Sequence, residues 1–567
     1  MERTGAQIIW ECLVHEGVQT VFGYPGGAIM PAYDALLDYP IHHVLVRHEQ
    51  GAAHMADGYA RASGRVGVAI ATSGPGATNL VTGIATAMMD SSPIVCITGQ
   101  VNSKLIGYDA FQEVDITGIT LPITKHNYLV TDVRELTHVL REAFYIARSG
   151  RRGPVLVDIA KDVQQALLRD WEYDDRPIQM TAYRQDKSPL TKDLQRAAGM
   201  IHEAKRPVIL AGQGVLLSGA MEELREFAEK TQTPVAMTLL GIGCFPASHP
   251  LNLGMMGMHG EAWVNNAIQQ SDLLLAMGMR FDDRVTGKLE SYATQAKKIH
   301  FEIDPSEVNK NVKVDSALIG DLRDTLGKLS AHIKACDHTD WNDQIVDMKG
   351  DSATRDILNL PDNGHLYTPH VINDLHRHTH GEAVVVSDVG QNQMWAAQYY
   401  KHDQPYTYIT TGGLGTMGFA LPAAIGAKFA RPEANVWAIV GDGGFQMTQS
   451  ELSTAAQEGI KVNIAIINNG YLGMVRQWQE FFFDKRYSAT PMRNPDFVKL
   501  AEAHGLTGIR VTKRSEVEPA VDQAEAIEGT VIVEFCVEKE DSVYPMVPNG
   551  ADLQNMIRRP VRVEEAG

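Results

Sequence analysis

The sequence predicts an α/β protein of three domains, each a mainly parallel, doubly wound sheet with helices on both faces. Short β-branched and apolar runs alternate with helical stretches along most of the 567 residues, a pattern that is typical of parallel sheets. Two polar stretches, 168–189 and 337–365, lack apolar periodicity and are interpreted as linkers. The expected domains are therefore residues 1–170, 188–345 and 365–567.

Composition excludes several classes of function. The formal net charge is −18 and no block of Lys and Arg occurs, which argues against nucleic acid as a partner. The five cysteines are scattered and form no Cys-x-x-Cys pair, so we expect reduced thiols and a cytoplasmic protein. No basic-then-apolar leader opens the chain and no apolar run reaches membrane-spanning length, so no membrane partner is expected.

In the first third, helices and strands alternate and the strands end in small or charged residues. The run 44–46 leads into Arg47, His48 and Glu49, ahead of an Ala-rich helix. Taken alone, Glu49 is a carboxylate favoured by the helix dipole, an effect of about 0.5 kcal/mol. The elements expected here are strands 20–23, 44–46, 66–71, 93–98 and 154–159 and helices 6–15, 28–37 and 51–62.

The central third repeats the α/β pattern. Gly212 and Gly214 follow its first strand as a fragment of a dinucleotide fingerprint, but the third glycine is missing at the usual spacing, so the signal is weak. The cluster 278–287 carries several charges and is by default a solvated loop. The elements expected here are strands 207–211, 234–237, 272–277 and 298–303 and a helix at 220–230.

The most informative stretch of the chain is 441–469. An apolar strand, 436–440, leads into Gly-Asp-Gly-Gly, which we expect to form a tight turn that only small residues permit. One helix should follow, with its apolar positions on one face and Gly459 at its end. A β-branched strand, 462–467, then ends at two asparagines.

Asp442 and Asn469 therefore both follow parallel strands, at the sheet edge where α/β proteins bind ligands. A carboxylate, an amide oxygen and a backbone carbonyl suit Mg²⁺, which prefers hard oxygen ligands and often shares its shell with a phosphate. The glycines and the helix N-terminus would allow a phosphate to approach closely. The alternative is an ordinary βαβ unit with a capping aspartate.

Gly-Asp-Gly followed by roughly thirty residues and Asn-Asn resembles the signature of thiamine-diphosphate enzymes. The resemblance implies that Asp442, Asn469 and the carbonyl of Tyr471 hold the Mg²⁺ that grips the diphosphate. Met417, which could otherwise be core filler, matches the apolar residue that wedges between the two cofactor rings. The other cofactor contacts that the resemblance implies here are Gly390, Gln391, Gly415, Gly441, Gly443, Gly444 and Met474.

The segment that begins at Arg47, RHEQGAAHMADGYARASG, resembles the one that carries the activating glutamate of this superfamily. By that resemblance Glu49 binds N1′ of the aminopyrimidine. It thereby favours the tautomer whose 4′-nitrogen removes the thiazolium proton.

Two stretches of the central third narrow the resemblance. Residues 253–260 and 278–287 resemble acetohydroxyacid synthase closely, and the resemblance covers essentially the whole chain. In that family the central domain carries FAD, which performs no obligatory redox step. The positions that match its FAD contacts are Arg151, Gly212, Gly214, Arg280, Asp283, Val285, Glu302, Ile303 and Asp321.

The same resemblance assigns active-site roles to residues that would not stand out alone. Lys161 is by default a solvated lysine. Arg284 could clamp the carboxylate of a second 2-oxoacid, and Trp478, on a helix and so more often a core residue, could pack the acceptor's alkyl tail. The loop 545–551 is a candidate lid. The active-site residues carried over are Gly27, Glu49, Phe111, Gln112, Lys161, Arg284 and Trp478.

The resemblance implies that the enzyme decarboxylates pyruvate and transfers the two-carbon unit to pyruvate or 2-oxobutyrate. The products, 2-acetolactate or 2-aceto-2-hydroxybutyrate, feed branched-chain amino-acid synthesis. It also implies a homodimer or tetramer with Glu49 and Asp442 of one site on different subunits, and a possible small regulatory subunit.

Three alternatives stay open. A flavin-using pyruvate oxidase and a simple 2-oxoacid decarboxylase share this fold, and a non-enzymatic module or regulatory relative is the third. Arg284 and Trp478 argue against the oxidase. The intact set of Glu49, Asp442 and Asn469 argues against the module, because a binding protein needs no proton relay.

Overall fold

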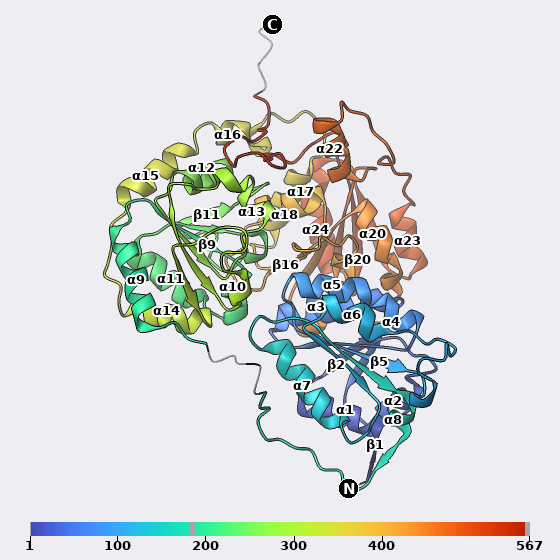
Figure 1. Cartoon of the computed structure of the whole chain (residues 1–567). Coiled ribbons are helices and arrows are strands. Elements are labelled where there is room, and N and C mark those ends of the chain that lie inside the picture. The colour runs from blue at the N-terminus through green and yellow to red at the C-terminus, as the bar shows by residue number, and fades with distance from the viewer. Residues whose placement is uncertain (1, 181–182, 184–186, 562–567) are drawn as a thin grey trace.

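The computed structural model describes residues 2–180, 183 and 187–561, and Figure 1 shows the course of the chain. The described residues form three six-stranded sheets, one after another along the chain. Every strand pairing within these sheets is parallel. A small antiparallel pair, β1 (Arg3–Thr4) with β8 (Leu167–Leu168), joins the two ends of the first third. The predicted fold class is confirmed.

The first sheet has the strand order β3-β2-β4-β5-β7-β6. Alternate residues of β4 and β5 pack into two different cores, one on each face, which explains their nearly continuous apolar sequences. The strands are β2 (Thr20–Gly23), β3 (His42–Leu45), β4 (Gly67–Ala71), β5 (Ile94–Gln100), β6 (His126–Val130) and β7 (Val155–Ala160). The helices are α1 (Gly5–His15), α2 (Met30–Leu36), α3 (Glu49–Ser63), α4 (Pro75–Asn79), α5 (Val81–Met89), α6 (Ile116–Thr120), α7 (Leu136–Arg148) and α8 (Lys161–Gln165).

The central sheet has the strand order β11-β10-β9-β12-β13-β14. Renumbered by their order in the chain, these strands lie in the order 3-2-1-4-5-6, which is typical of dinucleotide-binding sheets. The strands are β9 (Pro207–Ala211), β10 (Val235–Met237), β11 (Asn252–Met255), β12 (Leu273–Met277), β13 (Lys297–Glu302) and β14 (Ser316–Ile319). The helices are α9 (Thr191–Glu203), α10 (Gln213–Ser218), α11 (Met221–Thr231), α12 (Ala262–Gln270), α13 (Asp283–Thr286) and α14 (Leu322–Ser330).

The last sheet has the strand order β16-β15-β17-β18-β20-β19. Renumbered in the same way, the first and last sheets both have the order 2-1-3-4-6-5, so they share one topology. The strands are β15 (Val384–Ser387), β16 (Tyr408–Thr410), β17 (Val436–Gly441), β18 (Asn463–Asn468), β19 (Thr507–Val511) and β20 (Val531–Cys536). The helices are α17 (Thr368–His378), α18 (Gln391–Tyr399), α19 (Ala420–Ala430), α20 (Asp442–Thr448), α21 (Leu452–Glu458), α22 (Gly473–Phe482), α23 (Phe497–Ala503) and α24 (Val517–Ala526).

The stretch 337–365 is more ordered than the polar linker that its composition suggested. It contains two helices, α15 (Thr339–Met348) and α16 (Ser352–Arg355), as well as a short 3₁₀ turn. Trp341 and Ile345, one helical turn apart, are buried in a core of the central third. Two apolar residues at that spacing were the signal that we overlooked. The proposed domain boundaries stay a prediction.

Helices α3 and α19 pack along each other and join the first sheet to the last. Their backbones approach closely, because a Cβ on Gly58 would lie 2.1 Å from the carbonyl oxygen of Ala423. Arg61, on α3, forms ion pairs with Asp57 and Asp90 at 2.6 and 2.9 Å, and Asp90 accepts from the backbone N–H of Gly413 in the last third at 2.7 Å. One core cluster spans both sheets, so the two thirds are held together by apolar packing and a buried ionic network. Within the described ranges, no helix is long and apolar enough to cross a membrane.

Candidate active site

Three neighbouring strands of the last sheet end in polar residues. Asp388 follows β15, Asp442 follows β17 and Asn469 follows β18. The expected tight turn at 441–444 is wrong, since Gly441 ends β17 and Asp442 already begins α20. The expected single helix is also divided, because a 3₁₀ turn, η7 (Gln449–Glu451), separates α20 from α21. Strand and helix thus meet directly at the aspartate.

The carboxylate of Asp442 is buried and held by three donors. Its oxygens accept hydrogen bonds from the backbone N–H groups of Gly443 at 3.0 Å and Gly470 at 2.9 Å, and from Nδ2 of Asn494 at 2.6 Å. Burial raises the pKa of Asp442 to about 6, and the hydrogen bonds lower it in part. Among the described residues Asp442 forms no ion pair, so a cation would offset the cost of burying this charge.

Asn469 adds a second oxygen beside Asp442. Its Oδ1 accepts a hydrogen bond from the backbone N–H of Tyr471 at 3.0 Å, and its Nδ2 donates to Oε1 of Gln391 at 3.3 Å. In the part of the chain that the structure describes, no group of three or more His, Cys, Asp or Glu side chains is suited to a metal. One carboxylate with an amide and a backbone carbonyl therefore fits an ion that completes its shell with phosphate and water, as Mg²⁺ does.

The loop 411–419 is fixed by a second buried aspartate. Asp388 accepts hydrogen bonds from the backbone N–H of Gly418 at 3.0 and 3.1 Å and of Ala420 at 3.3 Å. A Cβ on Gly444 would lie 3.0 Å from the same carboxylate, so only glycine fits there without displacing it. Asp388 thereby sets where the neighbouring Met417 side chain emerges.

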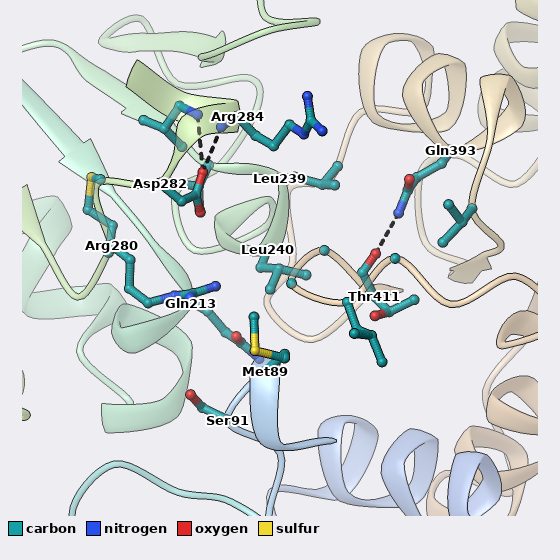
Figure 2. A pocket seen from close by; sticks show the side chains of 18 of the residues that line it. Met89, Ser91, Gln213, Leu239, Leu240, Arg280, Asp282, Arg284, Gln393 and Thr411 are labelled. Atoms are coloured by element: carbon teal, nitrogen blue, oxygen red, sulfur yellow. Dashed lines mark hydrogen bonds between the residues drawn. The ribbon is translucent and has the colours of Figure 1, made fainter. Parts of the chain in front are cut away.

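A cavity of about 1040 Å³ lies where the three thirds meet, and Figure 2 shows part of its lining. Met89 and Ser91 come from the first third, Arg280 and Arg284 from the central third, and Gln393 from the last. A volume of this size is at the upper end of small-molecule sites. The expected cofactor and metal positions that line it are Gly390, Gln391, Gly415, Met417, Gly441, Asp442, Gly443, Gly444, Asn469, Tyr471 and Met474.

The central third lines the same cavity with most of its expected positions. Arg280 forms no ion pair with any described residue, which leaves its guanidinium available to an anion. Arg151, in contrast, pairs with Glu307 at 2.9 Å and donates to Oγ of Ser91 at 3.0 Å. The expected positions that line the cavity here are Arg151, Gly214, Arg280, Asp283, Val285, Glu302, Ile303 and Asp321.

Gly212 does not line the cavity. A Cβ on it would lie 2.4 Å from the carbonyl oxygen of Gly278, so the close approach of two loops accounts for this glycine. Gly214, the second residue of α10, would meet Gly278 in the same way, with its Cβ at 2.6 Å from the Cα atom. Asp282, which we did not single out, caps α13 by accepting from the backbone N–H groups of Arg284 and Val285 (Figure 2).

Arg284 and Trp478 line the cavity together, as expected. The Arg284 side chain is 55% exposed and its nearest carboxylate, Asp283, is 3.8 Å away. Nη1 of Arg284 lies 3.4 Å from Sδ of Met258. Trp478 packs edge-to-face against Phe482, with 5.4 Å between the ring centroids. One side of the cavity thus offers a weakly paired cation near an indole ring.

Five expected active-site residues, all from the first third, do not line this cavity: Gly27, Glu49, Phe111, Gln112 and Lys161. Two of them, Glu49 and Gln112, lie close to the segment 72–76. A Cβ on Gly76 would lie 2.8 Å from Cγ2 of Thr72 and 3.2 Å from Oε1 of Glu49, and a Cβ on Gly74 would lie 2.8 Å from the carbonyl oxygen of Gln112. Lys161 begins α8, and Phe111 is 89% exposed.

Glu49 is the first residue of α3 and is only 8% exposed. Oε2 of Glu49 accepts a hydrogen bond from Nδ2 of Asn79 at 2.9 Å. One chain thus carries two separate groups of expected site residues, one around Glu49 and one around Asp442.

Comparison with known proteins decides the family. Three family models match in order: the N-terminal TPP binding domain of thiamine pyrophosphate enzymes over residues 3–119, their central domain over 194–329 and their C-terminal TPP binding domain over 388–535. The acetolactate synthase large subunit of Corynebacterium glutamicum is 50% identical over 97% of this chain and 89% of its own length. The acetolactate synthase isozyme 2 large subunit of Escherichia coli is 45% identical, over 98% and 99%.

The chain belongs to the acetolactate synthase large-subunit family of thiamine pyrophosphate enzymes. The match extends across domains of life, since the probable acetolactate synthase large subunit of Methanocaldococcus jannaschii is 45% identical over 99% of this chain and 96% of its own length. The oxidase alternative is not favoured by any of these relatives.

In this acetolactate synthase family member, sequence reasoning missed part of the lining. Met89 and Ser91, at the end of α5, and Leu239 and Leu240, just after β10, face the cavity (Figure 2). Gln393 was also missed, and its Nε2 donates to the carbonyl oxygen of Thr411 at 2.8 Å. The end of β10 gave a local signal, because it lies at the carboxyl edge of a parallel sheet, but apolar residues there do not stand out by type. The end of α5 gave none, since it leads into the start of β5.

Proposed function

We propose that this chain catalyses acetolactate synthase chemistry: decarboxylation of pyruvate and transfer of its two-carbon unit to a second 2-oxoacid. The observation that carries the proposal is that Arg284 and Trp478 share one cavity with Asp442, Asn469 and Met417. The first pair suits an acceptor that has a carboxylate and a short alkyl tail. The second set suits a diphosphate held by a metal. The relatives' names support the same reaction.

Thiamine diphosphate, when bound, supplies a nucleophilic carbon and accepts the electrons that remain when CO₂ leaves. In our proposal Asp442, Asn469 and the carbonyl of Tyr471 hold Mg²⁺ against the diphosphate. The fit rests on the buried Asp442 carboxylate, which has no cationic partner among the described residues. Met417 emerges into the cavity and would hold the cofactor rings in their folded arrangement.

Glu49 is proposed to hold a proton at N1′ of the aminopyrimidine, and so to activate the cofactor. It does not line the cavity that Asp442 lines in the same chain. We therefore propose a homodimer or a tetramer, in which the Glu49 region of one subunit completes the cavity of another. Exposed aromatic residues nearby, Phe111 at 89% and Tyr108 at 78%, support a contact surface there.

Arg284 is proposed to bind the carboxylate of the acceptor, and Trp478 to pack its alkyl end. A guanidinium binds a carboxylate through two parallel hydrogen bonds, which fixes the direction of the acceptor carbonyl. Excluding water from this part of the cavity would favour carbon–carbon bond formation over release of acetaldehyde. The loop 545–551 remains the candidate lid, and His259 Nδ1 lies 3.3 Å from the carbonyl oxygen of Pro545 within it.

FAD is proposed for the central third. The strand order of that sheet suits a dinucleotide, and Arg280 is free to bind an anionic group.

The large-subunit names of the relatives support a smaller regulatory partner. A cytoplasmic location is proposed from the cysteines, since all five are free thiols.

A product assay tests the proposal. The purified chain is incubated with pyruvate, Mg²⁺ and thiamine diphosphate, with and without FAD, and acetolactate and acetaldehyde are quantified. We expect acetolactate as the main product. Acetaldehyde as the main product would favour the simple decarboxylase, and anaerobic bleaching of the flavin by pyruvate on the catalytic timescale would favour the oxidase.

A further inference from the structure

Glu451 is a buried carboxylate that reaches from the last third of the chain into the first. It lies in η7, directly after the helix that begins with Asp442, and it is 0% exposed. Its Oε1 accepts from the backbone N–H of Arg47 at 3.1 Å and of His48 at 3.0 Å. Its Oε2 accepts from the same Arg47 N–H at 3.2 Å and from Oγ1 of Thr454 at 2.7 Å.

The two amides that Glu451 binds stand immediately before Glu49. His48 is the N-cap of α3, and its Nδ1 accepts from the backbone N–H of Gln50 at 3.1 Å. N–H groups at a helix N-terminus lack partners within the helix, so a carboxylate from elsewhere is stabilised there. Glu451 therefore fixes the path of the backbone just before the helix on which Glu49 is the first residue.

The fit between the two thirds is close at this point. A Cβ on Gly51 would lie 2.5 Å from Oε1 of Glu451, so a larger residue would push the carboxylate away. Burial raises the pKa of the Glu451 carboxyl, whereas its hydrogen bonds from Thr454, Arg47 and His48 lower it. Among the described residues Glu451 has no ion-pair partner, so backbone amides and one hydroxyl satisfy this buried charge.

Other contacts already join the last third of the chain to the first in this region. His42 Nε2 lies 2.8 Å from Oε2 of Glu458, and Nη2 of Arg47 donates to Oε1 of Gln457 at 2.8 Å. These groups are more exposed and bind side chains away from the start of α3. Glu451 differs from them because it binds the backbone amides next to Glu49. Attaching the last third to the first does not by itself require this contact with the backbone next to Glu49.

We propose that Glu451 is a positioning residue, which sets the direction of the Glu49 carboxyl by holding the backbone of Arg47 and His48. The proposal rests on the proposed function in one respect, namely that Glu49 activates the cofactor. It also gives a mechanical link within one chain, because α20 connects Asp442 at one end to η7 and Glu451 at the other. The regions around Asp442 and Glu49 of the same subunit are then held in fixed positions relative to each other.

Two variants and a matched control test this role. Glu451→Gln keeps the size of the side chain and removes its charge, and Gly51→Ala leaves Glu451 intact but pushes its carboxylate off the amides. Glu458→Gln makes the same chemical change at a contact that does not bear on Glu49. Each protein is assayed without 2-oxoacid for deuterium exchange at C2 of bound thiamine diphosphate, and for cofactor affinity with Mg²⁺. In the cofactor-free protein, amide hydrogen exchange is followed over residues 47–52.

Both test variants should slow C2 exchange about tenfold or more, because small misplacements of a catalytic group are costly. Cofactor affinity should stay within about threefold, and amide exchange over 47–52 should rise in the cofactor-free protein. Glu458→Gln should match the parent in all three measurements. If Glu451→Gln does not fold, Gly51→Ala carries the test.

Three results would overturn the positioning role. The first is C2 exchange within about twofold of the parent in Gly51→Ala and Glu451→Gln, although Glu49→Gln slows it. The second is an equal loss of exchange rate and cofactor affinity, which would indicate general loosening. The third is normal exchange in Glu49→Gln itself, and this result alone would also contradict the proposed function. If the chain did not transfer the two-carbon unit to an acceptor, C2 exchange would be unaffected, because that assay contains no 2-oxoacid. This failure would therefore be distinguished from a failure of the positioning role.

Discussion

The first and last sheets have one topology but carry different residues at corresponding strand ends. After the third strand in chain order, the last sheet has Asp442 and the first has Thr72. After the fourth, the last sheet has Asn469 and the first has Val101. At these two positions only the last sheet therefore offers a carboxylate and an amide oxygen, which suit a metal such as Mg²⁺. The shared fold supplies the positions, and the residue types at the strand ends decide what each position can bind.

The helix that follows the second strand shows the same contrast. In the first sheet it is α3, which begins at Glu49, and in the last sheet it is α19, which is preceded by the segment that carries Met417. These corresponding helices pack against each other. Two equivalent places in a repeated fold thus carry an acid in one copy and an apolar wedge in the other. The following predictions, from the largest expected effect to the smallest, test this division of roles.

The largest effect is expected where the two sheets are joined. Arg61, on α3, pairs with Asp57 and Asp90, and Asp90 also accepts from the backbone N–H of Gly413 at 2.7 Å. Arg61→Met would leave two buried carboxylates without a cation. We expect the free energy of unfolding to fall by about 3–5 kcal/mol, measured by denaturant titration.

The exposed pair of Arg134 with Asp132 provides a matched control for that measurement. The Arg134 side chain is 78% exposed, so Arg134→Met should leave the unfolding curve unchanged. If the two variants unfold at the same denaturant concentration, the buried network does not join the two sheets energetically.

Glu49→Gln tests the acid that only the first sheet carries. We expect turnover to fall by a factor on the order of 10² or more, because an amide cannot relay the proton. Folding and cofactor binding should persist, since the amide can still accept the hydrogen bond from Asn79. Steady-state kinetics with saturating pyruvate, beside a circular dichroism spectrum, provide the measurement. A rate near that of the parent would refute the assignment.

Asp442→Asn tests the metal site that only the last sheet carries. The affinity for Mg²⁺ in the presence of thiamine diphosphate should fall at least about tenfold, since even outer-shell partners of a metal contribute that much. This affinity is measured by titrating the metal-free protein with Mg²⁺ in the presence of thiamine diphosphate and following tryptophan fluorescence. The exposed Asp484 offers a control, and Asp484→Asn should bind Mg²⁺ as the parent does. Equal affinities in the two variants would place the metal elsewhere.

The smallest effect is expected at the acceptor side of the cavity. Trp478→Leu should reduce the preference for 2-oxobutyrate over pyruvate as acceptor by about 1 kcal/mol, the low end of what one methylene contributes in a pocket. Decarboxylation of pyruvate should continue. The product ratio in a competition between the two acceptors reports the change, and an unaltered ratio would remove Trp478 from specificity.

The sequence by itself determined the α/β class, about two thirds of the strands in the three sheets and the polar residues at several of their ends. Alternating apolar runs and helices specify parallel sheets locally, and Gly-Asp-Gly with Asn-Asn places oxygens at one sheet edge. It did not reveal the edge strands β6, β11, β14, β16 and β19, or the interior strand β20. In β6, for example, the half-exposed residues lack a continuous apolar run. It also misjudged the strand-to-helix transition at Asp442 and the helices within 337–365, where boundaries depend on packing.

Only the tertiary structure decided which residues meet. It brought Asp442, Met417, Arg280 and Trp478, which are far apart in the chain, around one cavity, and it left Glu49 outside that cavity. It also brought Glu451 to the amides before Glu49, a contact across some four hundred residues that no local pattern records. Local sequence fixes hydrogen bonding and periodicity within an element, whereas contacts between distant elements arise only when several sheets pack together.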